Sequence, residues 1–191
     1  MNIILLRHGR VAAEKPAAAI TQSAFRSWVS EYDNARLDTT SQPPAQLHEL
    51  AQRTQFIVCS DLSRSIQSAE VLQCEPNLVS PAYRECEMPV TDGSRVKLPV
   101  GIWMAAMRGL QLTGIHPNAE SASSFRLRTR QSAAQLNALA GLHRSVMLVG
   151  HGLLNRSLHK QLIKLGWKVE NGKHSDDHWS YRSYQFATRI K

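Results

Sequence analysis

The sequence predicts an α/β fold, a three-layer sandwich in which helices cover both faces of a mostly parallel central sheet. Three short apolar runs, residues 3–6, 56–59 and 146–149, have the length and composition of buried strands. Amphipathic or alanine-rich stretches separate these runs, as the crossover helices of a parallel sheet require. We expect the whole chain, residues 1–191, to form one domain.

The N-terminal third supplies one strand and two helices. The apolar run 3–6 ends at Arg7-His8-Gly9, because glycine favours a turn at the end of a strand. Apolar residues at helical spacing predict an amphipathic helix from residue 21 to about residue 35. Pro43-Pro44 opens the next helix, since proline suits the first helical turn.

The middle of the chain contains two further strands. After the run 56–59, Ser60-Asp61 is expected to form a turn and to cap the following helix, which ends before Pro76. A short strand is expected near residues 78–79. The apolar stretch 99–112 is too short to cross a membrane, and it is either a helical lid over a site or a helix of the core.

The C-terminal third completes the alternation of strands and helices. Residues 121–142 are expected to form a long alanine-rich helix, capped at Ser121 and ended by Gly141. A helix over residues 153–165 follows the third apolar run. Aromatic and polar residues then alternate over residues 179–184, which predicts a final strand at the edge of the sheet.

Composition limits the classes of partner. With 42% hydrophobic residues, no run long enough to cross a bilayer and no secretory pattern, we expect a cytoplasmic protein without a membrane partner. A net charge of +8 favours anionic partners. The densest basic group, Arg126, Arg128 and Arg130, has no aromatic ladder beside it and is interpreted as a solvated helix face. We therefore expect no specific binding of nucleic acid.

Polar, reactive residues follow all three apolar runs. Arg7 and His8 follow the first, and Arg64 comes shortly after the second. His151 follows the third. The carboxyl ends of parallel strands face one crevice, so we expect these four side chains to converge. Guanidinium groups bind phosphate oxygens bidentately, and the glycine after each histidine would let a backbone N–H approach the same anion. The sequence therefore predicts a phosphoryl-binding site.

A histidine at such a site suits nucleophilic catalysis. Its neutral ring nitrogen is basic and available near neutral pH, so it can accept the phosphoryl group before water does. The arginines and the second histidine would stabilise the charge that spreads over the transferring group. This chemistry needs no metal ion and no cofactor, and we expect neither.

Three segments carry these residues: Leu6-Arg7-His8-Gly9, residues 60–69 (SDLSRSIQSA) and Val149-Gly150-His151-Gly152. Together, and in this order, they resemble the three signature segments of the histidine phosphatase superfamily, which includes the phosphoglycerate mutases. The resemblance extends from the first strand to the helix after the third segment. It implies a phosphoglycerate mutase-like fold.

The resemblance also implies a role for each residue. His8 would be the phosphorylated nucleophile. Arg7 and Arg64 would bind the phosphoryl oxygens, and His151 would contact the same group in the transition state. The family's acid, which protonates the leaving oxygen, follows the strand after the second arginine's helix. Tyr83-Arg84-Glu85 matches that position in pattern, so Glu85 is expected to be the acid.

Two departures from the family's pattern leave alternatives open. Relatives often have glycine and aromatic residues shortly after the acid, whereas Cys86-Glu87-Met88-Pro89 stands here. Glu87 and then Glu120 therefore remain alternatives to Glu85. Arg10 stands where many relatives have an acidic or small polar residue, and it either contacts a second anionic group of the substrate or faces solvent.

The expected function is metal-independent hydrolysis of a phosphomonoester, a histidine acid phosphatase-type reaction through a phosphohistidine on His8. The substrate is a phosphorylated small molecule or a phosphoprotein, and the oligomeric state stays open. A phosphomutase would use the same residues, although the short interval between Glu85 and His151 favours hydrolysis. A non-catalytic module that binds a phosphorylated partner would lack His8 or the acid. The remaining histidines are expected to be surface or packing residues: His48, His116, His143, His159, His174 and His178.

Overall fold

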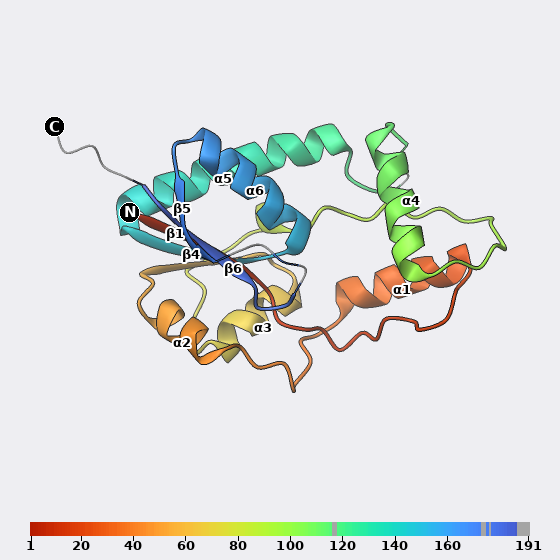
Figure 1. The fold of residues 1–191 in the computed structure, drawn as a ribbon, viewed down its shortest axis with the longest axis horizontal. Helices are drawn as coiled ribbons and strands as arrows, with labels where there is room; N and C mark the ends of the chain where they lie inside the picture. Colours follow the sequence, from red (N-terminus) through yellow and green to blue (C-terminus); the bar gives the residue numbers. More distant parts are fainter. Residues whose placement is uncertain (116–117, 173–174, 176, 187–191) are drawn as a thin grey trace.

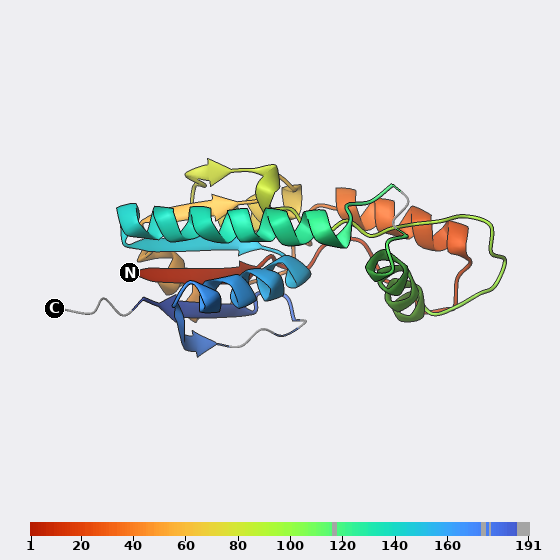
Figure 2. The same cartoon turned by 90° about the horizontal axis from the view of Figure 1, so that it is seen from above.

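The computed structural model describes residues 1–115, 118–172, 175 and 177–186, and these form a six-stranded sheet with helices on both faces (Figure 1 and Figure 2). The strand order is β3-β2-β4-β1-β6-β5. The first four of these are parallel, whereas β6 and β5 are antiparallel additions beyond β1. The strands are β1 (Asn2–Arg7), β2 (Phe56–Cys59), β3 (Leu78–Val79), β4 (Ser145–Gly150), β5 (Lys168–Gly172) and β6 (Tyr181–Gln185).

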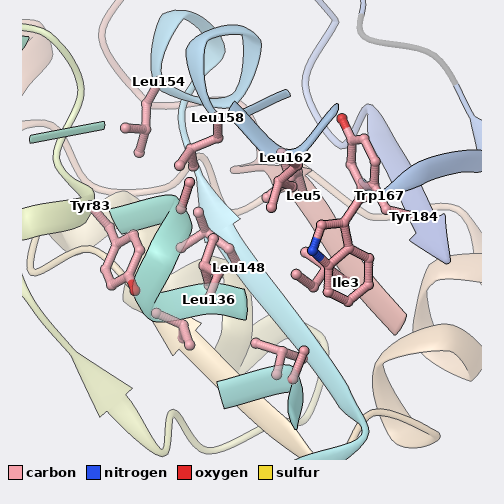
Figure 3. Close-up of a cluster of buried hydrophobic side chains, with 14 of the residues drawn as sticks. Ile3, Leu5, Tyr83, Leu136, Leu148, Leu154, Leu158, Leu162, Trp167 and Tyr184 are labelled. Carbon is pink, nitrogen blue, oxygen red and sulfur yellow. The ribbon is translucent and has the colours of Figure 1, made fainter. Parts of the chain in front are cut away.

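Alternate side chains of the central strands supply two apolar cores. Ile3 and Leu5 of β1 pack with α5 (Ala122–His143) and α6 (Gly152–Lys164) on one face (Figure 3). Ile4 and Leu6 of the same strand pack with α2 (Ala45–Gln52) and α3 (Ser63–Val71) on the other face. Alternate residues of one strand thus face helices on opposite sides of the sheet, which confirms the predicted three-layer sandwich.

The helices are α1 (Gln22–Asn34), α2 (Ala45–Gln52), α3 (Ser63–Val71), the 3-10 helix η1 (Pro81–Tyr83), α4 (Val100–Leu112), α5 (Ala122–His143) and α6 (Gly152–Lys164).

The register of the parallel strands brings their carboxyl ends to one edge. Arg7, the last residue of β1, pairs with Gly150 of β4. Cys59, the last residue of β2, pairs with Val149 of β4. Residues that follow β1, β2 and β4 therefore emerge side by side, although they are far apart in the sequence.

Two helices lie beyond this edge and form what we call the cap, defined as α1 and α4. Both views place them side by side at the end of the molecule away from the N-terminus (Figure 1 and Figure 2). They share a separate apolar cluster built on Phe25, Val100, Trp103 and Met107. Within the described residues, no helix combines the length and the apolar character needed to cross a membrane.

The predicted edge strand over residues 179–184 is wrong in its position. β6 begins at Tyr181 and lies between β1 and β5, so β5 forms the edge of the sheet. β5 has the sequence KVENG, and all its residues are exposed. Because an exposed polar strand carries no apolar run, the periodicity of the sequence gives no sign of it.

The predicted range of the long helix, residues 121–142, agrees with α5 to within one residue, but Gly141 does not end the helix. α5 continues through Gly141 to His143, and the left-handed backbone of Arg144 (φ 66°) follows it. Glycine inside a helix costs about 1 kcal/mol relative to alanine. The buried face of α5, which includes Leu136 and Ala140 at 0% exposure, offsets this cost.

The expected cap of α3 is replaced by a different arrangement. Leu62 is the N-cap residue, and its side chain makes no capping hydrogen bond. Ser60 instead turns toward His151, and Asp61 forms an ion pair with Arg84. Both candidate capping side chains are thus bound elsewhere.

Candidate active site

Three strand ends place four polar side chains at one edge of the sheet. Arg7 ends β1, and His8 follows it. Arg64 lies in the first turn of α3, and His151 is the N-cap residue of α6. The ring centroids of His8 and His151 are 5.1 Å apart. Because His8, Arg64 and His151 are 2%, 1% and 0% exposed, polar groups of the protein largely replace water around them.

The His8 ring is held in one tautomer. Its Nδ1 lies 2.7 Å from the carbonyl oxygen of Gly9, and a carbonyl oxygen can only accept, so Nδ1 carries the proton. Burial lowers the pKa of His8 well below the ordinary value, and the charges of Arg64 and Arg7 lower it further. A neutral ring with its proton on Nδ1 leaves the lone pair on Nε2.

His151 is fixed by a serine. Its Nε2 lies 2.7 Å from the hydroxyl oxygen of Ser60. Burial lowers the pKa of His151 well below its ordinary value, and the nearby His8 and Arg64 act in the same direction. The ring is therefore neutral, and if Nε2 accepts from the hydroxyl, Nδ1 is a donor. That Nδ1 is buried, and none of the described residues forms a hydrogen bond with it.

Arg64 is anchored at the end of α1. Its Nη1 donates to the carbonyl oxygens of Tyr32 (3.3 Å) and Asp33 (3.0 Å), and its Nη2 lies 3.3 Å from the Asp33 carboxylate. Its Nε is buried and has no hydrogen-bond partner in the described part of the chain. Buried polar groups in proteins almost always have partners, so these two donor atoms, Nε of Arg64 and Nδ1 of His151, stand out among the described residues.

The structure separates the three candidate acids. The Glu85 carboxylate accepts hydrogen bonds from the N–H groups of Leu153 (2.9 Å) and Leu154 (2.8 Å) at the start of α6. The Glu87 carboxylate accepts from the backbone N–H of Glu120 at 2.8 Å. The Glu120 carboxylate pairs with Arg128 at 2.6 Å.

Gly152 lies next to both Glu85 and Arg7. A side-chain carbon at Gly152 would lie 3.6 Å from Arg7 Nε and 3.8 Å from Glu85 Oε2, so the two side chains are neighbours. Arg84 beside Glu85 binds Asp61 instead. Of the three candidates, Glu85 is the one whose carboxylate is bound at the start of α6, directly after His151.

One expectation about the residues beside the site needs correction, and the structure gives the contacts of Arg10, for which two alternatives were open. The N–H of Gly9 donates to Ser68 Oγ at 2.9 Å, so it does not face an anion as the sequence suggested. Arg10 turns to the rim, where it donates to Asp38 at 2.9 Å and to Thr40 at 2.8 Å. Both groups thus form hydrogen bonds with neighbouring segments of the protein.

Sequence reasoning missed His178, which was expected to be a surface or packing residue. Its ring centroid is 5.5 Å from that of His8, and its Nδ1 lies 3.3 Å from the His8 carbonyl oxygen. Burial lowers its pKa, and the charge of Arg7 adds to this effect. No motif surrounds His178, so only the position of β6 beside β1 brings it here. Of the other histidines, His116 and His174 lie outside the described residues.

A hollow of about 1240 Å³ opens between this edge and the cap. Arg7, Arg64, Glu85 and His178 line it on the side of the sheet. The stretch 99–112, predicted to be either a lid or a core helix, has both features. Trp103 and Met107 of α4 are buried in the cap, while other residues of the same helix line the hollow.

In the described ranges, no group of three or more acidic, histidine or cysteine side chains is arranged to hold a metal ion.

The fold and this edge define a phosphoglycerate mutase-like α/β protein with paired histidines and arginines at the carboxyl ends of its strands. The family model of the histidine phosphatase superfamily (branch 1) matches residues 3–178. The chain therefore belongs to the histidine phosphatase superfamily. No curated protein sequence matches it.

Solved structures show the same fold. An open reading frame product from Mycobacterium tuberculosis is 19% identical with a TM-score of 0.58, covering 98% of this chain and 95% of that chain. Phosphoserine phosphatase from Entamoeba histolytica is 16% identical with a TM-score of 0.52, covering 98% of both chains. A mycobacterial glucosyl-3-phosphoglycerate phosphatase is 20% identical with a TM-score of 0.51, covering 85% of this chain and 79% of that chain.

Proposed function

We propose that the protein hydrolyses phosphomonoesters through a covalent phosphohistidine on His8, as a single-domain enzyme of the histidine acid phosphatase type. One observation carries the proposal. The His8 imidazole is buried and neutral, with Nδ1 donating to a carbonyl oxygen, and it lies among Arg7, Arg64 and His151. A lone pair on Nε2 beside cationic groups is what attack on a phosphoryl group requires.

The reaction consists of two displacements. In the first, Nε2 of His8 attacks phosphorus, and the bond between phosphorus and the ester oxygen breaks. Glu85 gives its proton to that oxygen, which leaves as an alcohol. In the second, the Glu85 carboxylate takes a proton from water while the water oxygen attacks phosphorus. The phosphorus–nitrogen bond breaks, inorganic phosphate leaves, and the neutral His8 ring returns.

The surrounding donors stabilise the transferring group. Nδ1 of His151 and Nε of Arg64 are the buried atoms identified above, and equatorial phosphoryl oxygens would accept from them. Arg7 adds positive charge on the side of Glu85. Because these groups are in place before the substrate arrives, little reorganisation accompanies the reaction.

Glu85 lines the hollow, and the His8 ring lies 5.5 Å from that of His178, another lining residue, which supports an enzyme over a non-catalytic phosphate-binding module. Hydrolysis and phosphomutase activity differ in the acceptor of the phosphoryl group. Here water is the acceptor, and a phosphorylated small molecule or a phosphoprotein is the donor.

The test is turnover of 4-nitrophenyl phosphate with and without EDTA, comparing the wild type with His8→Ala and with His48→Ala as a control on α2. We expect activity that EDTA leaves intact, a loss of about 10³-fold or more in His8→Ala, and no change in His48→Ala. Turnover that survives in His8→Ala would exclude the proposed nucleophile. Adding an excess of a second alcohol checks the acceptor, since a mutase would transfer the phosphoryl group to it instead of releasing phosphate.

A further inference from the structure

The side of the hollow away from the sheet is apolar and aromatic. Trp28, Val29 and Tyr32 of α1 line it, together with Met88 and Met104. The three α1 residues are half-buried, so they present part of their surface to the hollow. Trp28 and Tyr32 are four residues apart on a helix and therefore share a face.

The aromatic surface begins at the phosphate-binding end of the hollow. The Arg64 guanidinium carbon lies 5.3 Å from the centre of the Tyr32 ring. The Tyr32 ring is 5.6 Å from the Trp28 ring, with 43° between their planes. An aromatic strip, defined as Tyr32 and Trp28, thus leads from Arg64 into the cap.

The strip is held in place by the cap. Trp28 Nε1 donates to the carbonyl oxygen of Glu14 at 2.9 Å, which fixes the indole and satisfies its polar edge. The Phe25 ring of the cap cluster lies 6.0 Å from it. A rigid aromatic surface loses little conformational entropy when a ligand covers it.

Three of the arginines that line the hollow are engaged in contacts within the protein. Arg10 pairs with Asp38, and Arg84 pairs with Asp61. Arg108 of α4 donates to the carbonyl oxygens of Cys86 and Glu87. A second phosphate or carboxylate on the substrate would have to compete with these contacts, whereas an apolar ring would not.

We propose that the aromatic strip is the subsite for the alcohol part of the substrate, and that the preferred substrates are phosphomonoesters whose alcohol carries a planar aromatic or heteroaromatic ring. This inference rests on the proposed function. With phosphorus at His8, the ester oxygen points toward the hollow, and a ring a few bonds away reaches Tyr32 and Trp28. Planar rings gain from offset or edge contacts with aromatic side chains and from contact with the polarisable side chains of Met88 and Met104, which also line the hollow.

The experiment compares three alkyl phosphates with similar leaving groups: 2-phenylethyl, 2-cyclohexylethyl and ethyl phosphate. We expect kcat/KM for the phenyl ester to exceed that of the ethyl ester by about tenfold or more, and that of the cyclohexyl ester by a few-fold, with most of the difference in KM. Trp28→Leu removes the preference for phenyl over cyclohexyl, and Trp28→Phe retains part of it. Ile102→Ala, a change on the exposed side of α4, leaves all three values unchanged.

Binding separates this inference from the proposed function. Calorimetry with 2-phenylethylphosphonate and ethylphosphonate measures the subsite without any turnover. We expect the phenyl compound to bind about tenfold more tightly in the wild type, and this difference to shrink in Trp28→Leu. The subsite would be overturned if the wild type bound the two phosphonates with equal affinity. It would also be overturned if Trp28→Leu lowered the affinity for both by the same factor. A binding preference in a protein without turnover would leave the subsite standing and remove the proposed hydrolysis.

Discussion

The hydroxyl oxygen of Ser60 lies 2.7 Å from Nε2 of His151, and this contact leaves Nδ1 as the ring nitrogen without a hydrogen bond among the described residues. Ser60 is fully buried, and its own N–H donates to Ser65 Oγ at 3.1 Å. Ser65 Oγ in turn donates to the carbonyl oxygen of Val149 at 2.6 Å, at the end of β4. A chain of hydrogen bonds thus joins the ends of β2 and β4 to the His151 ring.

Ser60→Ala tests this positioning role. Losing a buried hydrogen bond costs about 1–3 kcal/mol, so we expect kcat to fall by about tenfold to a hundredfold with a small change in KM. Ser60→Thr keeps the hydroxyl and should retain more activity. Steady-state kinetics on an alkyl phosphate checks both variants. Wild-type kcat in Ser60→Ala would contradict the role given to this contact.

Glu85→Gln tests the identity of the acid. General acid catalysis is worth about 10²- to 10⁴-fold, and it matters most when the leaving oxygen is strongly basic. We expect phosphoryl transfer from an alkyl phosphate to slow by that amount, and transfer from 4-nitrophenyl phosphate to slow far less. Single-turnover kinetics on both esters separates these cases.

Glu87→Gln and Glu120→Gln are the matched controls. Their carboxylates bind a backbone N–H and Arg128, so we expect changes in stability but no dependence of the rate on the leaving group. The same dependence on the leaving group in Glu87→Gln, with none in Glu85→Gln, would transfer the role to Glu87.

Gly9→Ala tests the packing behind His8. A side-chain carbon at Gly9 would lie 2.4 Å from Trp179 Cζ2 and 2.9 Å from Leu37 Cδ1, and both partners are buried. Overpacking of this kind costs about 1–3 kcal/mol of unfolding free energy. Gly152→Ala, where the nearest such atom is 3.6 Å away, should change stability much less. Chemical denaturation measures the free energy of unfolding of both variants. Equal values would contradict the prediction and would show that Trp179 and Leu37 move to make room for the added carbon.

The two buried histidines predict a pH dependence of stability. Burial holds the pKa values of His8 and His151 well below the value of about 6.5 that unfolded histidine has. Below pH 6.5 the unfolded chain binds protons that the folded protein does not, so the free energy of unfolding falls as the pH decreases. Histidine ring NMR should show both rings neutral at pH 6, with His8→Asn and His151→Asn providing the assignments. Titration of both rings near 6.5 would contradict this prediction.

The sequence predicts the sheet and most of the site for a physical reason. Buried parallel strands are continuous apolar runs, and Arg7, His8 and His151 directly follow two of them. The ends of such strands must meet, so neither side-chain contacts nor helix packing is needed to place these residues together.

The remaining features depend on tertiary contacts that leave no local pattern. β5 is exposed and polar, so its pairing with β6 is decided by the rest of the sheet. His178 reaches His8 because β6 lies antiparallel to β1. The contact of Ser60 with His151 spans 91 positions in the sequence. The spacing of Trp28 and Tyr32 on α1 is visible in the sequence, but the position of Tyr32 against Arg64 is a tertiary contact.

The phosphohistidine on His8 is the central claim, and trapping it is the most direct test. Glu85→Gln with 4-nitrophenyl phosphate labelled with ³²P should accumulate the intermediate, because the good leaving group needs no acid while attack by water lacks its base. Quenching in alkali, where phosphohistidine survives, followed by peptide mapping should place the label on His8, and His8→Ala should show none. Label on another residue, or turnover of wild-type enzyme with no label on His8 in either protein, would contradict the account.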